Sequence, residues 1–424
     1  MVASYASLIS RDFKFIMTEN FKPETPEQVL ELVNWAAADG HVFDVSGSSS
    51  KKAYGRSSET ANGLSLSAFA GITLYEPEEL VMAMGAGTPI AEIHAALQEK
   101  NQHLAFEPMD LGPLLGGSPN GGTIGGALAC NLSGPRRIKL GAARDHLLGF
   151  KAISGRGEHF KSGGRVVKNV TGFDLSKLMT GSMGTLGVLT AVTLKVLPAP
   201  ERTRTVLIMG DDTSTAVQAM TAALQSPHEV SAAAHIPAAL AARSEVSYIA
   251  GAGTGVMAIR VEGPGPSADV RCEKLRDLLA GFGEIQELHS MNSAKFWREV
   301  RDVKFFTNDA SSEKQIWRIS VPPASGADVA ATIMGALGGE VYFDWGGGLI
   351  WLALDRREDA GHEIIRGALK DGGHATLIRA AGAVRANTPV FHLQPGPLAE
   401  ITKRTKTAFD PKGVLNPGRM YEGV

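Results

Sequence analysis

Apolar residues recur at helical spacing near the start of the chain. Thr25 and Gln28 have the spacing of a capping box, and Pro26 suits the first position of a helix. The apolar residues that follow fall on one helical face: Val29, Leu32, Val33 and Ala36. The pattern therefore predicts a helix that begins at Pro26 and ends near Gly40.

Short apolar runs separated by turn residues predict strands in the rest of the first half. They span residues 41–46, 72–75, 80–84, 147–153, 158–160 and 188–196. We expect a helix after Thr88, which has the position of an N-cap before Pro89. A second, shorter helix is expected from its cap at Asp174 to Leu178.

The second half alternates strands with helices. The expected strands span 205–209, 256–261 and 316–321, and the expected helices span 215–225 and 269–281. Residues 340–354 have the pattern of a hairpin that turns at Gly346–Gly348. Two β-α-β units of this kind suggest an antiparallel sheet backed by helices, as in ferredoxin-like folds.

Two further features of the second half concern side chains. The hairpin carries aromatic residues that either form a docking face or pack into the core, and burial tendencies favour the core: Tyr342, Phe343, Trp345 and Trp351. Near the C-terminus, residues 398–409 predict a helix with three cations facing outward: Lys403, Arg404 and Lys406.

Length and composition narrow the class of protein. A chain of 424 residues is too long for one ordinary core and suggests two or three domains. The net charge of −2 gives no electrostatic attraction for nucleic acid. Cys130 and Cys272 are the only cysteines, so the sequence supports no disulfide framework, zinc site or iron–sulfur cluster of its own. Charges at Arg11, Asp12 and Lys14 interrupt any apolar run that a signal peptide would need.

Glycine is concentrated in three stretches that could approach a ligand closely. The longest, Pro119–Gly134, holds two glycine pairs and predicts a buried cofactor floor, with a surface loop as the alternative. The uncharged stretch of sequence that contains it is long enough to span a bilayer. Its glycines, prolines and asparagines nevertheless make a lipid-exposed helix implausible. Gly47–Lys51 combines backbone N–H groups, three hydroxyls and an ammonium group, which suits a pyrophosphate, or else is a serine-rich turn. Gly181–Gly187 repeats the close-approach chemistry.

Several common catalytic motifs are absent from the sequence. It contains no G-x-G-x-x-G fingerprint and no Walker A loop, so a Rossmann or P-loop nucleotide site is not supported. Neither H-E-x-x-H nor G-x-S-x-G occurs, which removes the zincin and nucleophile-elbow interpretations.

Four segments in register resemble the vanillyl-alcohol-oxidase (PCMH-type) family of FAD-linked oxidoreductases. They are the strand and loop at 47–55, GGTIGGALACNLSG, VKNVTGFDLSKLMTGSMGTLGVLT and FDPKGVLNPGRM. More narrowly, GPRRIKLGAARDHLLG followed by GGRVVKNVTGFDLSKL resembles the FAD-binding subunit of bacterial glycolate oxidase. The resemblance covers nearly all of the chain from Pro23 to Tyr421.

The resemblance implies an α+β fold in four parts. A loose N-terminus would span residues 1–22, a PCMH-type FAD-binding domain of two subdomains 23–200, and a ferredoxin-like cap 201–395. A C-terminal helix and tail, 396–424, would return to the flavin.

The resemblance also assigns cofactor contacts residue by residue. The FAD pyrophosphate would be held by Gly47, Ser48, Ser49, Ser50 and Lys51. The flavin and its ribityl chain would contact Thr123, Gly125, Gly126 and Ser133, the adenine side would contact Gly184, Leu186, Gly187 and Val188, and the isoalloxazine ring would contact Asn416. Because the first loop holds serine and lysine where covalent members carry histidine, we expect non-covalent FAD.

The chain departs from its hydroxy-acid-oxidising relatives in one respect. It has no H-x-G-D-G-N-x-H stretch near the substrate, so catalytic residues stay unassigned and no metal site is expected. Oxidation of a 2-hydroxy acid calls for a cation on the carboxylate and a base for the hydroxyl proton. The candidate cations are Arg136, Arg137, Lys168, Arg379 and Arg385, and the candidate bases are His374 and His392.

Three functions follow as hypotheses. The first is a redox subunit that oxidises glycolate to glyoxylate with a second flavoprotein subunit and an iron–sulfur subunit. The second is a stand-alone FAD-dependent 2-hydroxy-acid dehydrogenase, such as a D-lactate dehydrogenase, and the third is an assembly subunit that keeps the fold without a redox role. The first hypothesis implies a cytoplasmic protein, with the inner membrane reached only through the complex.

Overall fold

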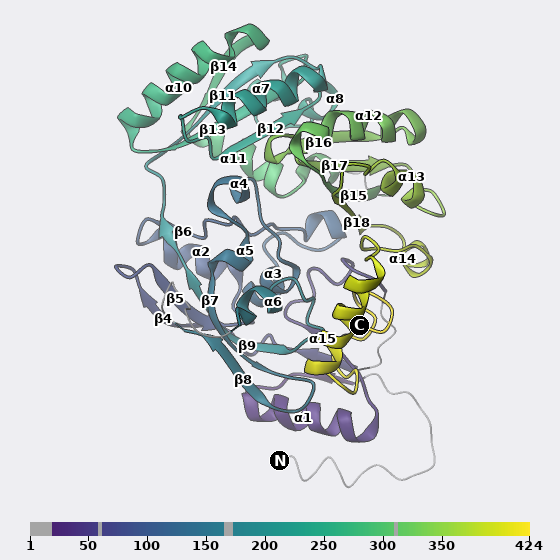
Figure 1. The fold of residues 1–424 in the computed structure, drawn as a ribbon. Helices are drawn as coiled ribbons and strands as arrows, with labels where there is room; N and C mark the ends of the chain where they lie inside the picture. Colours follow the sequence, from purple (N-terminus) through teal and green to yellow (C-terminus); the bar gives the residue numbers. More distant parts are fainter. Residues whose placement is uncertain (1–18, 58–61, 165–172, 309–312) are drawn as a thin grey trace.

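The computed structural model describes residues 19–57, 62–164, 173–308 and 313–424. Figure 1 shows a lower part built from the first half of the chain and an upper part built around a large sheet. Helix α15, drawn in yellow, brings the chain back from the upper part to the lower one. The first of the cofactor loops and the C-terminal tail therefore belong to the same part of the molecule.

A small parallel sheet and helix α1 (Pro26–Asp39) begin the lower part. The sheet has the order β1 (Asn20–Phe21), β3 (Asn62–Ser65), β2 (Phe43–Ser46). The predicted helix and its capping box are confirmed, and its apolar face is buried against Phe43 and Leu64. The expectation of a loose segment up to residue 22 is wrong at its end, because strand β1 pairs with β3. Residues 1–18 lie outside the described part.

A five-stranded antiparallel sheet forms the second layer of the lower part. Its order is β4 (Ile72–Glu76), β5 (Val81–Gly85), β9 (Val188–Lys195), β7 (Leu147–Ile153), β8 (His159–Gly163). It packs against α2 (Ile90–Gln98), α3 (Ile124–Cys130), α5 (Ala143–His146) and α6 (Leu175–Met179). The expected cap at Asp174 is confirmed. The expected cap at Thr88 is wrong: Pro89 is the N-cap, and the Thr88 hydroxyl donates to the carbonyl of Gly85 instead, at 2.7 Å.

The upper part is one eight-stranded antiparallel sheet with helices on its outer face. The strand order is β14 (Glu284–His289), β11 (Arg202–Met209), β13 (Val256–Gly263), β12 (Ala232–Ile236), β16 (Glu340–Asp344), β17 (Leu349–Leu354), β15 (Gln315–Ser320), β18 (His374–Arg379). The outer face packs against α7 (Thr213–Gln225), α10 (Gly265–Leu279), α12 (Gly326–Leu337) and α13 (His362–Gly367). The expected antiparallel sheet backed by helices is confirmed.

The other face of the large sheet turns toward the lower part (Figure 1). Helix α11 (Ser290–Arg301) and one buried apolar cluster from both parts fill this space. The predicted hairpin is confirmed, and its aromatic residues Tyr342, Phe343, Trp345 and Trp351 are buried. The core interpretation of these residues is therefore correct, and the docking interpretation is wrong.

The remaining described elements are short connections. They are β6 (Gln102–His103), η2 (Pro113–Leu115), α4 (Arg137–Leu140), β10 (Leu197–Pro198), α8 (Ala238–Ala241), α9 (Ser247–Ala250), η3 (Ala280–Phe282), η4 (Lys304–Phe306), η6 (Pro323–Ser325), η7 (Trp345–Gly347) and α14 (Gly382–Asn387). Among the described residues, no helix combines the length and apolar character that crossing a bilayer would require.

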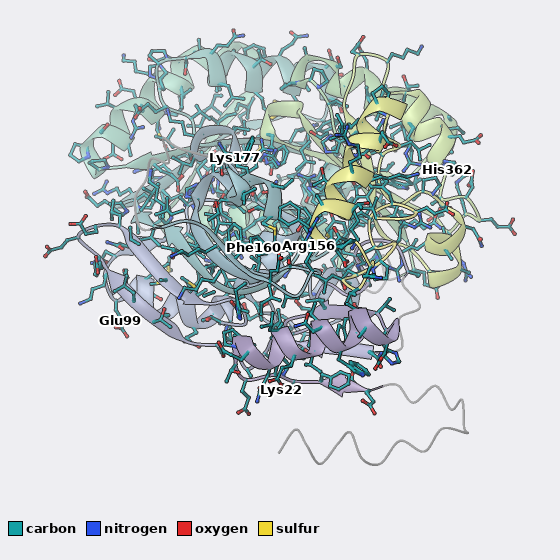
Figure 2. All side chains as sticks on the ribbon, turned by 60° about the horizontal axis from the view of Figure 1, so that its bottom comes forward. Lys22, Glu99, Arg156, Phe160, Lys177 and His362 are labelled. Carbon is teal, nitrogen blue, oxygen red and sulfur yellow. The ribbon has the colours of Figure 1, made fainter. Side chains whose placement is uncertain are left out.

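Helix α15 (Gly396–Phe409) docks on the hairpin of β7 and β8. Figure 2 shows Arg156 and Phe160 beside it: Arg156 Nε donates to the carbonyl of Ala408 at 2.6 Å, and the Phe160 ring contacts Phe409. Lys403 and Arg404 are exposed, but the expected outward position of Lys406 is wrong, because its side chain is buried. Three acceptors satisfy its ammonium group, which the helical pattern alone could not reveal.

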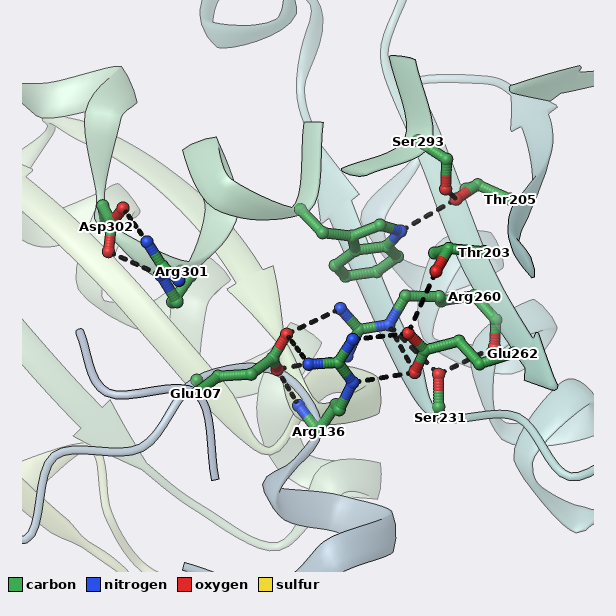
Figure 3. A network of polar contacts seen from close by, with 12 residues as sticks. Glu107, Arg136, Thr203, Thr205, Ser231, Arg260, Glu262, Ser293, Arg301 and Asp302 are labelled. Carbon is green, nitrogen blue, oxygen red and sulfur yellow. Dashed lines mark hydrogen bonds and ion pairs between the residues drawn. The ribbon is translucent and has the colours of Figure 1, made fainter. Parts of the chain in front are cut away.

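A network of buried ion pairs joins the two parts (Figure 3). Arg260 of the large sheet donates two hydrogen bonds to the Glu107 carboxylate, at 2.9 and 3.1 Å, and Arg136 pairs with both Glu107 and Glu262. Burial alone would raise the pKa of Glu107, but Arg260 and Arg136 outweigh it and hold that pKa below its ordinary value. The network therefore keeps Glu107 charged.

Replacing Glu107 by Gln should strongly destabilise the junction. The change removes the carboxylate that accepts two hydrogen bonds from Arg260 and leaves Glu262 to balance both Arg260 and Arg136. Breaking a buried ion pair in this way typically costs about 3–5 kcal/mol. Urea unfolding of the variant, beside that of the exposed control Glu358→Gln, measures the loss. Equal midpoints for the two variants would contradict the assigned role.

Candidate functional site

One cleft of the lower part collects most of the residues assigned to the cofactor. It lies open to solvent between the first loop, helix α3 and the loop that carries Gly184. The assigned residues that line it are Gly47, Ser48, Ser49, Ser50, Lys51, Thr123, Gly125, Gly126, Gly184, Gly187 and Asn416. Segments more than 300 positions apart in the sequence thus meet at one cleft.

Three assigned residues are buried beside the cleft without lining it. Ser133 accepts a hydrogen bond from the backbone N–H of Ala143 at 2.9 Å, and Leu186 and Val188 belong to apolar clusters. Their contact with the cofactor stays a prediction, as does that of the residues that line the cleft.

Two glycines of the cleft lie so close to neighbouring segments that a side chain would not fit. A side chain at Gly47 would collide with the Thr123 hydroxyl, and one at Gly125 would collide with the carbonyl of Ala86. The Lys51 ammonium lies against the glycine backbone at Gly122. This wall offers backbone, hydroxyl and ammonium groups to an anionic ligand.

The glycine-rich stretch differs in one way from the expected floor. Residues 124–130 form helix α3, whose N-cap Thr123 accepts from the N–H of Gly126. Two adjacent glycines argue against a helix because each lowers helix propensity by about 1 kcal/mol. Burial of Ile124, Ala127 and Leu128 compensates for that cost.

Asn416 ties the two walls of the cleft together. Its Oδ1 accepts from the backbone N–H of Val45 at 2.6 Å, and its Nδ2 donates to the carbonyl of Met183 at 2.7 Å. Its own backbone N–H donates to the carbonyl of Phe43. The side-chain amide therefore fixes the spacing between strand β2 and the loop that carries Gly184.

Sequence reasoning missed several residues of the cleft. The most informative is Arg419, whose guanidinium donates to the carbonyls of Lys52 and Tyr54 at 2.7 and 2.6 Å. Others that line the cleft are Asp44, Val45, Ser46, Lys52, Leu66, Ala129, Cys130, Ser182, Met183 and Leu189. Arg419 could have been found from the sequence, because it lies in the same terminal segment, NPGRM, from which Asn416 was assigned.

Most of the candidate cations are engaged in structural contacts. Arg136 belongs to the ion-pair network, Arg379 donates to the carbonyls of Leu114 and Phe306, and Arg385 donates to those of Ala53 and Gly55. Lys168 lies outside the described residues. Arg137 differs from these, since its guanidinium lies over the Trp345 ring, 4.5 Å from the centroid.

The two candidate bases are not brought to the cleft. His374 begins strand β18 and is exposed, and His392 is partly buried with an unpartnered Nδ1. Burial and the nearby Arg366 lower the pKa of His392, so its imidazole is neutral at neutral pH. Neither residue lines the cleft, and a catalytic role for either stays a prediction.

Comparison with known proteins supports the fold and an FAD binding domain in the lower part of the molecule. An FAD binding domain family model matches residues 20–163. The solved structure of p-cresol methylhydroxylase with substrate bound superposes with a TM-score of 0.71 at 14% identity, covering 94% of this chain and 88% of that one. Alkyldihydroxyacetonephosphate synthase superposes with a TM-score of 0.66 at 17% identity, covering 94% and 75%. The chain thus belongs to the class of proteins that combine an FAD binding domain with a PCMH-type fold.

Sequence relatives narrow this class. Glycolate oxidase subunit GlcE of Escherichia coli is 35% identical over 93% of this chain and 97% of its own length. Glycolate oxidase subunit GlcD of Bacillus subtilis is 24% identical over 70% and 68%. The chain belongs to the glycolate oxidase subunit GlcE family.

Replacing Asn416 by Ala should weaken FAD binding by loosening the cleft. The variant leaves the Val45 N–H and the Met183 carbonyl without their hydrogen-bond partners, which costs about 2 kcal/mol of stability. If this cost falls on the FAD-bound state, the affinity for FAD decreases roughly 30-fold. Titration of the apoprotein with FAD measures the change. The control Asn387→Ala loses only a hydrogen bond within its own helix and should bind like the parent. Unchanged affinity in Asn416→Ala would contradict the assignment.

Proposed function

We propose that this chain is the FAD-binding redox subunit of a glycolate oxidase complex, which oxidises glycolate to glyoxylate with partner subunits. The observation that carries the proposal is the cleft itself, because glycine-requiring backbone, hydroxyl groups and Lys51 converge there from three distant segments. The similarity to GlcE along almost the whole chain supports the same function.

The cleft brings together most of the residues that the family resemblance assigned to FAD, and their chemistry suits an anionic cofactor. Bound FAD would supply an acceptor for the two electrons released when a 2-hydroxy acid becomes a 2-oxo acid. Ser48, Ser49, Ser50 and Lys51 would hold its pyrophosphate through hydroxyl, N–H and ammonium groups. Asn416 would act as a positioning residue, since both ends of its amide are committed to the protein.

We further propose that the FAD is not covalently attached. Among the described residues, no histidine lines the cleft. Cys130 does line it, but burial raises the pKa of its thiol. A protonated thiol is a poor nucleophile, which favours non-covalent binding.

The partners proposed for this chain are a second flavoprotein subunit and an iron–sulfur subunit. The two glycolate oxidase subunits among its relatives carry different names, which supports an assembly of several chains. A cytoplasmic location, with any membrane attachment made through the partners, stays a prediction.

An absorbance spectrum tests the function. The purified chain should be yellow and should release its FAD into the supernatant on acid precipitation. With glycolate added anaerobically, the flavin should bleach only when the partner subunits are present. Bleaching by the chain alone would favour a self-sufficient dehydrogenase, and a colourless chain that cannot be reconstituted with FAD would leave only an assembly role.

A further inference from the structure

Arg318 is a buried arginine without a counter-charge. It lies on strand β15, only 8% of it is exposed, and its Nε is buried without a hydrogen-bond partner. Among the described residues, none forms an ion pair or hydrogen bond with its guanidinium. A buried charge in this condition is costly unless something else pairs with it.

The other buried arginines near the junction do not share this condition. Arg260 and Arg136 pair with Glu107, and Arg301 makes two hydrogen bonds to the Asp302 carboxylate. Arg419, which is as buried as Arg318, donates instead to the carbonyls of Lys52 and Tyr54. Arg318 thus differs from these arginines because it has neither a carboxylate nor a carbonyl partner in the described part of the chain, and it calls for its own explanation.

Arg318 faces the lower part of the molecule. Its neighbours in the strand, Trp317 and Ile319, belong to the apolar cluster under the outer helices, so alternation directs Arg318 to the opposite face. The partner directly opposite it on β17 is Trp351, which belongs to the cluster between the two parts. That cluster includes Met183, which also lines the cofactor cleft. The guanidinium thus lies on the cofactor side of the sheet.

Trp345 brings Arg318 together with Arg137 from the lower part. The guanidinium carbons lie 4.9 Å and 4.5 Å from the centroid of its ring. Cation–π contact offsets part of the desolvation of each cation. It leaves their hydrogen-bond donors unused, and two like charges on one ring repel each other.

The indole of Trp345 is held firmly in this position. Its Nε1 donates to the carbonyl of Gly134 at 3.2 Å, and its backbone N–H donates to the Asp344 carboxylate at 2.7 Å. Its φ of 53° is unusual for a bulky residue and persists only where the surroundings enforce it. The two arginines are therefore arranged by a rigid element that spans both parts.

Asp344 does not neutralise the pair. It is buried and forms no ion pair with either arginine among the described contacts. Burial raises the pKa of its carboxyl to about 7, so it is only partly ionised at neutral pH. Asp344 thus gives Arg318 only part of a counter-charge, and the guanidinium group stays available to an external anion.

We propose that Arg318 and Arg137 form a binding subsite for the carboxylate of a small 2-hydroxy or 2-oxo acid. The inference rests on the proposed function, since the apolar cluster that contains Trp345 extends to Met183, which lines the FAD cleft. Guanidinium groups bind carboxylates through paired N–H donors, and the half-buried Arg137 gives the ligand access from solvent. The chain would then contact the substrate itself and not only relay electrons.

Oxalate binding to the FAD-loaded chain tests the subsite. Oxalate is a small carboxylate that resembles glycolate but has no oxidisable C–H bond, so calorimetry reports binding without turnover. Arg318→Gln should weaken oxalate binding by about tenfold or more, because it removes a charge-assisted hydrogen bond to the carboxylate. Arg137→Gln should weaken it as well, and Arg318→Lys should keep part of the affinity, since it retains the charge but loses the fork. The exposed Arg356→Gln is the matched control and should bind like the parent.

The outcomes separate the subsite from the proposed function. Parental oxalate affinity in Arg318→Gln, or no saturable binding to the FAD-loaded parent, would overturn the subsite and leave the flavin role standing. If a chain that cannot hold FAD still binds oxalate, and this binding depends on the arginines, the subsite would stand and the flavin role would be overturned. If Arg318→Gln fails to fold, as judged by its melting curve, Arg318→Lys and Arg137→Gln decide, and parental affinity in both would reject the proposal.

Discussion

The buried hydrogen bonds of the C-terminal tail hold the cofactor cleft together. Asp410 accepts from the backbone N–H groups of Val414 and Leu415 at 2.9 and 2.8 Å, and from Lys406 at 2.7 Å. The Lys406 ammonium uses its other donors on the carbonyls of Thr185 and Leu415. This arrangement satisfies a buried charge completely and fixes the tail against the loop that carries Gly184. Asn416 and Arg419 can then reach the opposite wall.

Two groups of buried or half-buried charged side chains lie where the two parts of the molecule meet, and among the described residues only one of them is neutralised by ion pairs. Around Glu107, carboxylates balance arginines, and the contact is structural. Around Trp345, two arginines share one aromatic ring without a carboxylate ion pair. In the first arrangement the opposite charges offset the cost of their own desolvation, whereas in the second that cost is not offset by a carboxylate, as is common at binding sites. The contrast is the physical basis for locating the substrate on this face of the large sheet.

Local signals explain which features could be predicted from the sequence. The capping box at Thr25, the cap at Asp174 and the glycine turn of the hairpin each depend on neighbours a few residues away. The burial of Lys406 could not be predicted, because its acceptor at Thr185 is 221 positions distant. Arg318 was missed for a similar reason. Strand alternation predicts that Arg318 and Trp317 point to opposite faces of the sheet, but it does not predict that the face of Arg318 packs against another part of the chain. For the cofactor, the resemblance supplied residues that the structure places around one cleft, whereas Ser133, Leu186 and Val188 lie behind its walls.

Hydrogen–deuterium exchange with and without FAD tests the central claim most directly, namely that the tail-bound cleft holds the cofactor. Peptides that cover residues 46–51 and 182–187 should gain protection when FAD binds, because both line the cleft. Peptides from the outer helices α10 and α12 should not change. Protection confined to other parts of the chain, or none at all on saturation with FAD, would contradict the assignment of this cleft.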